Sequence, residues 1–207
     1  MPPVKLPTPS ITIPIGLDPA PLDPATLFGR HRPLEVDIGS GKGRFLLARA
    51  AACPEVDFIG TERQRRRVDK VATKAARAGL ANIRLLHTEI DFALERLLPD
   101  QAVSTFYIFY PDPWPKRRHH PRRLINADFI HLLHRKLQPH GHVHFATDDL
   151  DYFAAAEPLF ATSPRFARCA PFIPAPAEQT DFELLFAAQG KHANRCSFTA
   201  NVAGKDG

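Results

Sequence analysis

From residue 33 to residue 160, short apolar runs alternate with longer segments of helical periodicity, and this alternation limits the possible folds more than any other feature. The predicted strands are residues 34–38, 56–61, 83–86, 105–109 and 141–147, and the predicted helices are residues 43–52, 64–78, 92–97, 124–137 and 150–160. Strands separated by helices require right-handed crossovers, and such crossovers place the strands in a parallel sheet. We therefore expect an α/β fold built on a doubly wound, mostly parallel sheet.

The two ends of the chain differ from this pattern. Residues 1–30 are rich in proline, which cannot continue a helix, so we expect an N-terminal extension that is extended or disordered and lies over a main domain of residues 31–207. After Pro164, residues 166–172 and 195–202 resemble strands, which would add an antiparallel edge to the sheet. Residues 180–190, between them, are expected to form a loop.

Composition narrows the class of protein. The net charge of +5 over 207 residues favours a polyanionic partner. Cys53, Cys169 and Cys196 are odd in number and far apart, which indicates reduced thiols rather than a disulfide framework or a zinc site. The histidines show no metal-ligand spacing, no apolar run approaches the ~20 residues that span a bilayer, and no signal-peptide layout is seen. We expect a soluble, cytoplasmic protein without a bound metal.

A glycine-rich turn joins the first predicted strand to the first predicted helix. Gly39, Gly41 and Gly43 allow the backbone to turn sharply and to approach a ligand closely. Their G-x-G-x-G spacing differs from the dinucleotide G-x-G-x-x-G, and no G-K-[ST] follows as a phosphate-binding loop requires. Asp37 precedes the glycines, and Glu62 lies about 20 residues beyond them, where a carboxylate can accept both hydroxyls of a ribose. The turn therefore predicts a cofactor that contains adenosine.

Acidic residues follow the ends of successive predicted strands, namely Asp37, Glu62, Glu89 and Asp112. Because ligands of such sheets bind at the carboxyl ends of the strands, these side chains are expected to surround one site, with Glu89 near the adenine edge. Asp148 follows the fifth strand on the same rim. Thr180 and Glu183 add a hydroxyl and a carboxylate from the later loop.

The segment that follows residues 106–109 combines three kinds of group. Pro111, Pro113 and Pro115 end the strand and frame Asp112 and Trp114. A cationic cluster follows directly, formed by Lys116, Arg117, Arg118, Arg122 and Arg123. A carboxylate, an indole and several cations at one point suit a substrate that is polyanionic and carries bases. A charge run alone would more often be a solvated basic loop, but the three prolines that frame Asp112 and Trp114 argue against that interpretation.

Taken together, these residues resemble the bacterial tRNA (guanine-N7-)-methyltransferases, which have the class I S-adenosylmethionine-dependent fold. The resemblance covers residues 28–200, and its most specific part is Pro-Asp-Pro-Trp-Pro-Lys at 111–116 with the two arginines at 122 and 123. It also rests on residues 35–45, 60–62 and 145–148 and on the Thr180-x-x-Glu183 tetrad. It implies transfer of a methyl group from S-adenosylmethionine to N7 of guanine 46 in the tRNA variable loop.

The resemblance also implies roles for single residues. The implied cofactor-binding residues are Asp37, Gly39, Gly41, Glu62, Glu89 and Asp112, and the implied substrate-binding residues are Lys116, Asp148, Thr180, Glu183, Arg122 and Arg123. Asp112 and Asp148 are the implied catalytic pair. The chain departs from the family at residues 108–110, where asparagine or small residues are frequent, at Glu89, where aspartate is usual, and in a loose version of the ending at 190–195. These departures concern pocket detail more than the reaction.

Two alternatives remain open from the sequence. One is a class I methyltransferase that acts on another RNA site or on a small molecule, although the basic stretch after Trp114 argues against a small substrate. The other is a non-catalytic tRNA-binding protein of the same fold, against which the intact Asp37, Gly39 and Glu62 argue. The expected partner is tRNA, and we expect no membrane association, no obligatory protein partner, and a monomer or homodimer.

Overall fold

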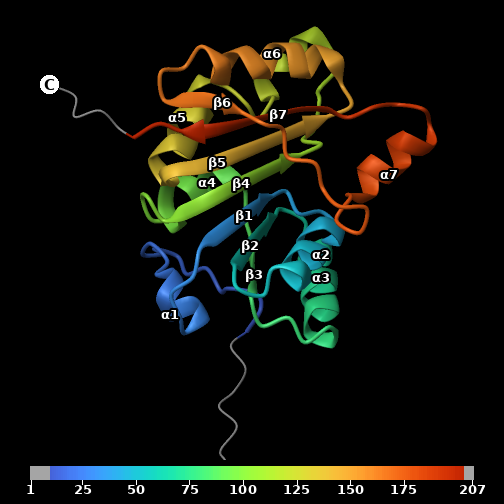
Figure 1. The fold of residues 1–207 in the computed structure, drawn as a ribbon. Coiled ribbons are helices and arrows are strands. Elements are labelled where there is room, and N and C mark those ends of the chain that lie inside the picture. The colour runs from blue at the N-terminus through green and yellow to red at the C-terminus, as the bar shows by residue number, and fades with distance from the viewer. Residues whose placement is uncertain (1–9, 203–207) are drawn as a thin grey trace, which may run out of the picture.

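The computed structural model describes residues 10–202, and a seven-stranded sheet of order β3-β2-β1-β4-β5-β7-β6 runs through it (Figure 1). The strands are β1 Leu34–Ile38, β2 Asp57–Glu62, β3 Ile83–His87, β4 Val103–Phe109, β5 Leu137–Thr147, β6 Phe166–Cys169 and β7 Asn194–Ala200. The first five strands pair in parallel, whereas β7 is antiparallel to both β5 and β6. The predicted doubly wound, mostly parallel sheet with an antiparallel C-terminal edge is confirmed.

Helices cover both faces of the sheet. They are α1 Pro24–Phe28, α2 Arg44–Ala52, α3 Arg65–Arg77, α4 Ile90–Phe92, the π-helical turn η1 Ala93–Leu97, the 3-10 segment η2 Arg117–Arg122, α5 Ala127–Lys136, α6 Leu150–Ala161 and α7 Asp181–Ala188. Alternate residues of a strand face opposite sides, so Phe58 packs with α2 and α3 while Ile59 belongs to the larger core beneath η1, α5 and α6. Within residues 10–202, no helix has the length and apolar character that crossing a membrane would require.

The expectation of a loop at residues 180–190 is wrong, because most of this segment forms α7. The hydroxyl oxygen of Thr180 accepts a hydrogen bond from the backbone N–H of Glu183 at 3.0 Å, which caps the helix. Gly190, at φ 72°, turns the chain after the helix. The predicted strand at 166–172 is also too long, since β6 ends at Cys169.

A cap explains the later start of α5. The predicted helix at 124–137 begins at Ala127, because Asn126 accepts a hydrogen bond from the N–H of Phe129 at 3.0 Å. It ends at Lys136, and β5 starts at the next residue, earlier than the predicted residue 141.

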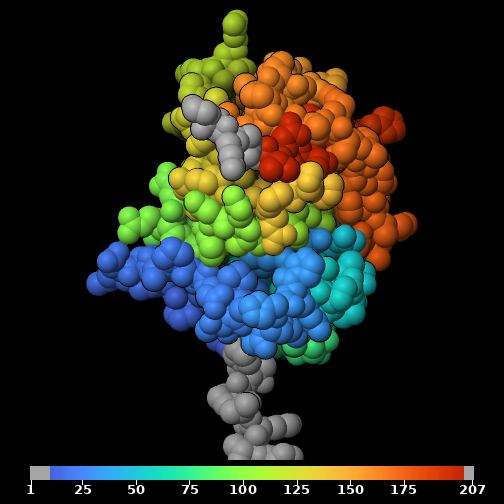
Figure 2. Space-filling model, turned by 60° about the vertical axis from the view of Figure 1, so that its left-hand side comes forward, coloured from blue at the N-terminus to red at the C-terminus, as the bar shows by residue number. Residues whose placement is uncertain are grey.

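The N-terminal segment lies along the outer edge of β3. The N–H of Ile13 donates to the carbonyl of Leu85 at 2.9 Å, and the N–H of Leu85 donates to the carbonyl of Ile11 at 2.7 Å. Ile13 is buried, and these bonds cover an edge that would otherwise expose unpaired backbone groups. Figure 2 shows the segment (dark blue) on the surface below the green part of the chain that holds η1, where Leu22 bonds to Leu97. Residues 1–9 of the predicted extension lie outside the described residues.

Candidate active site at the carboxyl ends of the strands

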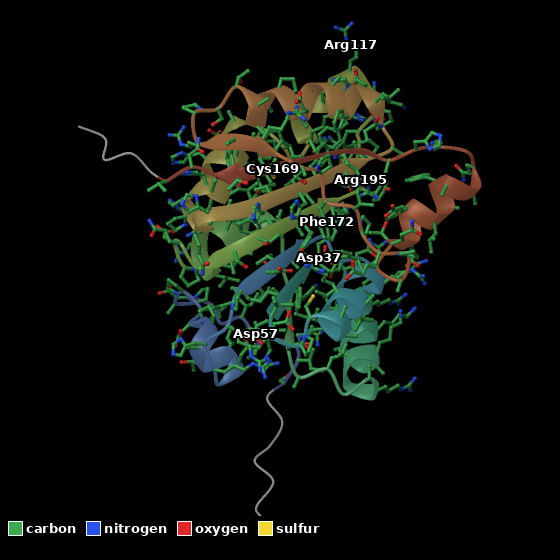
Figure 3. The ribbon with its side chains drawn as sticks, viewed as in Figure 1. Asp37, Asp57, Arg117, Cys169, Phe172 and Arg195 are labelled. Carbon is green, nitrogen blue, oxygen red and sulfur yellow. The ribbon has the colours of Figure 1, made fainter. Side chains whose placement is uncertain are left out.

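A cavity of ≈ 990 Å³ opens where β1, β2 and β4 end, in the region of Asp37 in Figure 3. Of the residues predicted to form the site, those that line this cavity are Asp37, Gly39, Gly41, Glu62, Glu89, Asp112, Arg122, Arg123 and Thr180. Lys116, Asp148 and Glu183 are absent from the lining. The sheet thus brings the predicted strand-end acids together, as its parallel topology requires.

The glycine turn forms the cavity floor beside β1. Gly39 and Gly41 have φ values of 71° and 57°, which side-chain-bearing residues rarely adopt. A Cβ atom on Gly39 would meet no heavy atom within 4 Å, so at this point the bare backbone faces open space. A hydrogen bond to β2 holds the turn in place, because the N–H of Ser40 donates to the carbonyl of Thr61 at 2.9 Å. Ser40 Oγ is buried and has no hydrogen-bond partner within the described residues.

Two of the cavity carboxylates are buried. Asp37 is 4% exposed, and its pKa is raised to about 7 because burial penalises the charged form and because the negative charge of Glu62 lies nearby. Glu62 is 6% exposed, and its Oε1 accepts a hydrogen bond from the N–H of Gln64 at 2.8 Å. Arg67 approaches the other oxygen of Glu62 at 3.4 Å. Two acceptors side by side suit a ligand that offers hydroxyl or ammonium donors.

Of the carboxylates predicted from the sequence to line the cavity, the other two, Glu89 and Asp112, are exposed. Glu89 precedes α4 without capping it. Asp112 forms an ion pair with Arg63 at 3.4 Å, with more than half of each side chain exposed. Since exposed pairs contribute little to stability, Asp112 is free to change partners when a ligand binds.

Two arginines of α2 hold the segment that leads into α7. The guanidinium of Arg49 lies 3.4 Å from Glu178 and stacks 5.3 Å from the ring centroid of Phe172, which Figure 3 labels beside the sheet. Arg44 Nε donates to the carbonyl of Gln179 at 3.0 Å. These contacts place Thr180 at the cavity although it is distant in sequence from the glycine turn.

Asp148 and Glu183 have cationic partners next to the cavity. Asp148 accepts a hydrogen bond from Lys191 Nζ at 3.1 Å, and Glu183 pairs with Arg195. Glu183 Oε2 is buried and has no hydrogen-bond partner among residues 10–202. Both carboxylates are therefore held by the chain that leaves α7, rather than turned into the cavity.

The neighbouring Arg122 and Arg123 have different environments. Arg122 is exposed and lies 5.1 Å from the ring centroid of Trp114. Arg123 is 7% exposed, donates to the carbonyl of Pro113 at 2.9 Å, and pairs with Asp151 at 2.5 Å. Lys116 is exposed and precedes η2. Of these cations, Arg122 is the one at the cavity that is free to meet a ligand.

An apolar rim contributed by α7 was missed in the sequence. Phe182, Leu184 and Leu185 line the cavity and are exposed. The rings of Phe182 and Phe186 lie 6.4 Å and 5.7 Å from that of Tyr110, whose φ of 53° turns the chain after β4. The signal for this rim was the capping pattern Thr180-x-x-Glu183 ahead of an apolar run, which indicates a helix start.

Comparison with known sequences identifies relatives along most of the chain. Residues 31–195 match the family described as "Putative methyltransferase". A tRNA (guanine-N(7)-)-methyltransferase of Nitrosococcus oceani is 44% identical over 67% of this chain, and the match spans 58% of that relative. The protein of the same name from Nitrosomonas eutropha is 36% identical, over 84% of this chain and 79% of its own length.

Solved structures with the same fold are more distant in sequence. The 16S rRNA methyltransferase KamB superposes with a TM-score of 0.62 at 15% identity, covering 86% of this chain and 92% of its own. A 16S rRNA (adenine(1408)-N(1))-methyltransferase from Catenulisporales acidiphilia, solved with cosubstrate SAM, gives a TM-score of 0.58 at 17% identity, covering 87% and 92%. At such identities the likeness establishes the fold alone.

Proposed function

Because the chain belongs to the family of tRNA (guanine-N7-)-methyltransferases, we propose that it transfers a methyl group from S-adenosylmethionine to N7 of guanine 46 in the tRNA variable loop. The observation that carries the proposal is the cavity itself. It combines a glycine turn and buried acceptors on one side with a basic, aromatic rim on the other. An enzyme that acts on a small molecule would not need the basic, aromatic rim. A non-catalytic tRNA-binding protein would not need the glycine turn and its buried acceptors.

The residues of the glycine turn suit the cofactor. Glu62 offers acceptors to the ribose hydroxyls, and Asp37 offers one to a cationic group. Gly39 and Gly41 leave the backbone open beneath the methionine part. Glu89 would lie near the adenine, and Asp112 would complete the ring toward the substrate. When bound, S-adenosylmethionine supplies an electrophilic methyl group on a sulfonium.

The proposed chemistry needs positioning more than proton transfer. Guanine N7 has an in-plane lone pair at neutral pH, so it attacks the methyl carbon directly while the carbon–sulfur bond breaks. The positive charge passes from sulfur to the guanine ring, and no proton has to leave. The role of the protein is to hold N7 in line with the methyl group, which lowers the barrier through orientation.

On the substrate side, carboxylates would hold the base. Guanine presents N–H donors on its Watson–Crick edge, and Asp148 or Glu183 would accept them while offsetting the charge that develops on the ring. Asp112, at the boundary of the two halves, is proposed to orient the reacting groups. Thr180 and Lys116 would fix the ribose or phosphate. A base drawn out of the tRNA core would regain stacking on Trp114 or Tyr110.

The test is a tritiated-methyl transfer assay with S-adenosylmethionine and unmodified tRNA transcripts that differ only at guanine 46. We expect labelling that is lost when guanine 46 is replaced by adenine. A control transcript with a replaced guanine elsewhere in the variable region should label normally. Labelling that persists without guanine 46 would assign a different target base. A protein that binds tRNA, but neither binds S-adenosylmethionine nor transfers the tritiated methyl group, would be a binding module. That outcome would contradict the proposal.

A further inference from the structure

A basic stripe runs along the exposed side of α3, and no step of the proposed reaction uses it. The stripe consists of Arg66, Lys70 and Arg77, all exposed, on a helix whose buried side is Val68, Val71 and Ala75. Positions i, i+4 and i+11 fall within about 40° of one another around a helix, so the three cations share one face. Arg77 lies about 16 Å beyond Arg66 along the helix axis.

The cations of this stripe differ from their neighbours in lacking internal partners. Arg65 pairs with Asp69, and Arg67 approaches Glu62. Lys74 donates to the carbonyl of Lys42 at 3.1 Å. In the part of the chain that the structure describes, no carboxylate forms an ion pair with Arg66, Lys70 or Arg77. Like charges repel at i,i+4 spacing, so Arg66 and Lys70 weaken the helix slightly unless an external anion offsets them.

The stripe begins at the cavity and leads away from it. Gln64 and Arg67, which lie two residues before and one residue after Arg66, belong to the cavity lining. The basic 3-10 segment η2 lies on the other side. Figure 3 places Arg117 at the top of the molecule and Asp37 below it, and in the same view Figure 1 places α3 at the lower right. Cationic surfaces therefore extend from the cavity in two directions.

We infer that the α3 stripe is a second docking surface for the sugar–phosphate backbone of tRNA, on the side of the cavity opposite η2. The inference rests on the proposed function, because it takes the RNA that delivers the guanine as the occupant. A folded tRNA extends well beyond one nucleotide on both sides of its reacting base, whereas the η2 cations reach only one side. Phosphates along the stripe would neutralise it and fix the register of the RNA.

The experiment compares two triple variants that remove the same charge. One is Arg66→Gln, Lys70→Gln and Arg77→Gln in the stripe. The control is Arg32→Gln, Arg135→Gln and Arg165→Gln, three exposed cations just before β1, β5 and β6, at the end of the sheet away from the cavity. Two of them have internal contacts, because Arg32 donates to the carbonyl of Pro54 and Arg135 pairs with Asp100. Glutamine keeps helix propensity, so both variants should fold, which thermal melting would verify.

The readout is the dissociation constant for unmodified tRNA, measured by filter binding across a range of salt. The stripe variant should bind about tenfold or more weakly, with a salt slope reduced by about 2 to 3, and the control should stay within about twofold of the parent. The dissociation constant for S-adenosylmethionine should be equal in all three proteins. If both variants bound tRNA equally more weakly, the effect would come from net charge alone, and the inference would be overturned. Unchanged tRNA binding by the stripe variant would overturn it as well. Methyl transfer by the parent protein tests the proposed function separately, because binding is measured without turnover.

Discussion

The two sides of the cavity present carboxylates in opposite conditions. On the side of β1 and β2, Asp37 and Glu62 are buried and line the cavity directly. On the side of β5 and α7, Asp148 and Glu183 lie next to the cavity and are paired with Lys191 and Arg195. Although Arg67 approaches Glu62 at 3.4 Å, the first pair already faces the cavity in the free protein. The second pair is held outside the cavity by its two cationic partners.

This difference follows from how each side is built. The first side comes from two strand ends and one turn, which the backbone hydrogen bonds of the sheet hold in place. The second side depends on the segment from α7 to β7, in which Glu183 pairs with Arg195 and Lys191 pairs with Asp148, 43 residues away in the sequence. We infer that the cofactor side is preformed, whereas on the substrate side Asp148 and Glu183 must share or exchange partners when the guanine arrives.

The largest effect is expected from Asp148→Ala. If Asp148 holds the guanine edge in the transition state, kcat should fall by about 10²–10³, as for loss of one preorganised polar group, while the dissociation constant for S-adenosylmethionine stays unchanged. Single-turnover methyl transfer and calorimetric titration measure the two quantities. The adjacent Asp149 is a matched control, because it caps α6 by accepting from Tyr152. Asp149→Ala should lower the melting temperature and leave kcat nearly intact; equal losses of kcat in both variants would remove Asp148 from the role.

Glu62→Ala should act on the opposite side of the cavity. Hydrogen bonds to a charged acceptor contribute about 1.5–3 kcal/mol, so the dissociation constant for S-adenosylmethionine should rise about ten- to hundredfold. Glu89→Ala, at an exposed carboxylate, should raise it less. Saturating cofactor should restore kcat in Glu62→Ala, in contrast to Asp148→Ala. An unchanged dissociation constant would mean that Glu62 does not contact the cofactor.

The same contrast shows which parts of the site could be predicted from the sequence. Asp37, the glycines and Glu62 were predictable because strand, turn and helix are short-range patterns and parallel strands all end at one edge. The pairing of Asp148 with Lys191 was not, because that contact depends on the path taken after α7. The α7 helix itself was predicted as a loop because Thr180 and Glu183 were read as ligand groups, although the same tetrad caps the helix. Arg122 and Arg123 looked equivalent because burial cannot be deduced from a charge run.

The two arginines therefore provide a third prediction. Arg122→Ala should raise the tRNA Michaelis constant about three- to tenfold without changing the melting temperature, because the exposed guanidinium beside Trp114 is available to phosphate. Arg123→Ala should instead lower stability by about 1–3 kcal/mol, since it removes a buried side chain that packs on Tyr152 and pairs with Asp151. Steady-state kinetics and thermal melting separate the two. If both variants altered only the Michaelis constant, the burial of Arg123 would have no role in stability.

The smallest effect concerns the preformed side and its dependence on pH. Burial and the charge of Glu62 raise the pKa of Asp37 to about 7 from an ordinary value of 3.8. Between these values the folded protein keeps a proton that the unfolded chain has released, so this contribution to stability is complete below about pH 4 and is lost as pH rises through 7. The Asp37→Asn variant has no ionisable group at this position, so its stability should not show this loss as the pH rises. The difference in melting temperature between the variant and the parent should therefore change by about 2–6 °C in favour of the variant from pH 5 to pH 8, measured without cofactor. Melting curves that shift in parallel for the two proteins would show that Asp37 is solvated in the free protein, and the cofactor side would then be no more preformed than the side that holds Asp148.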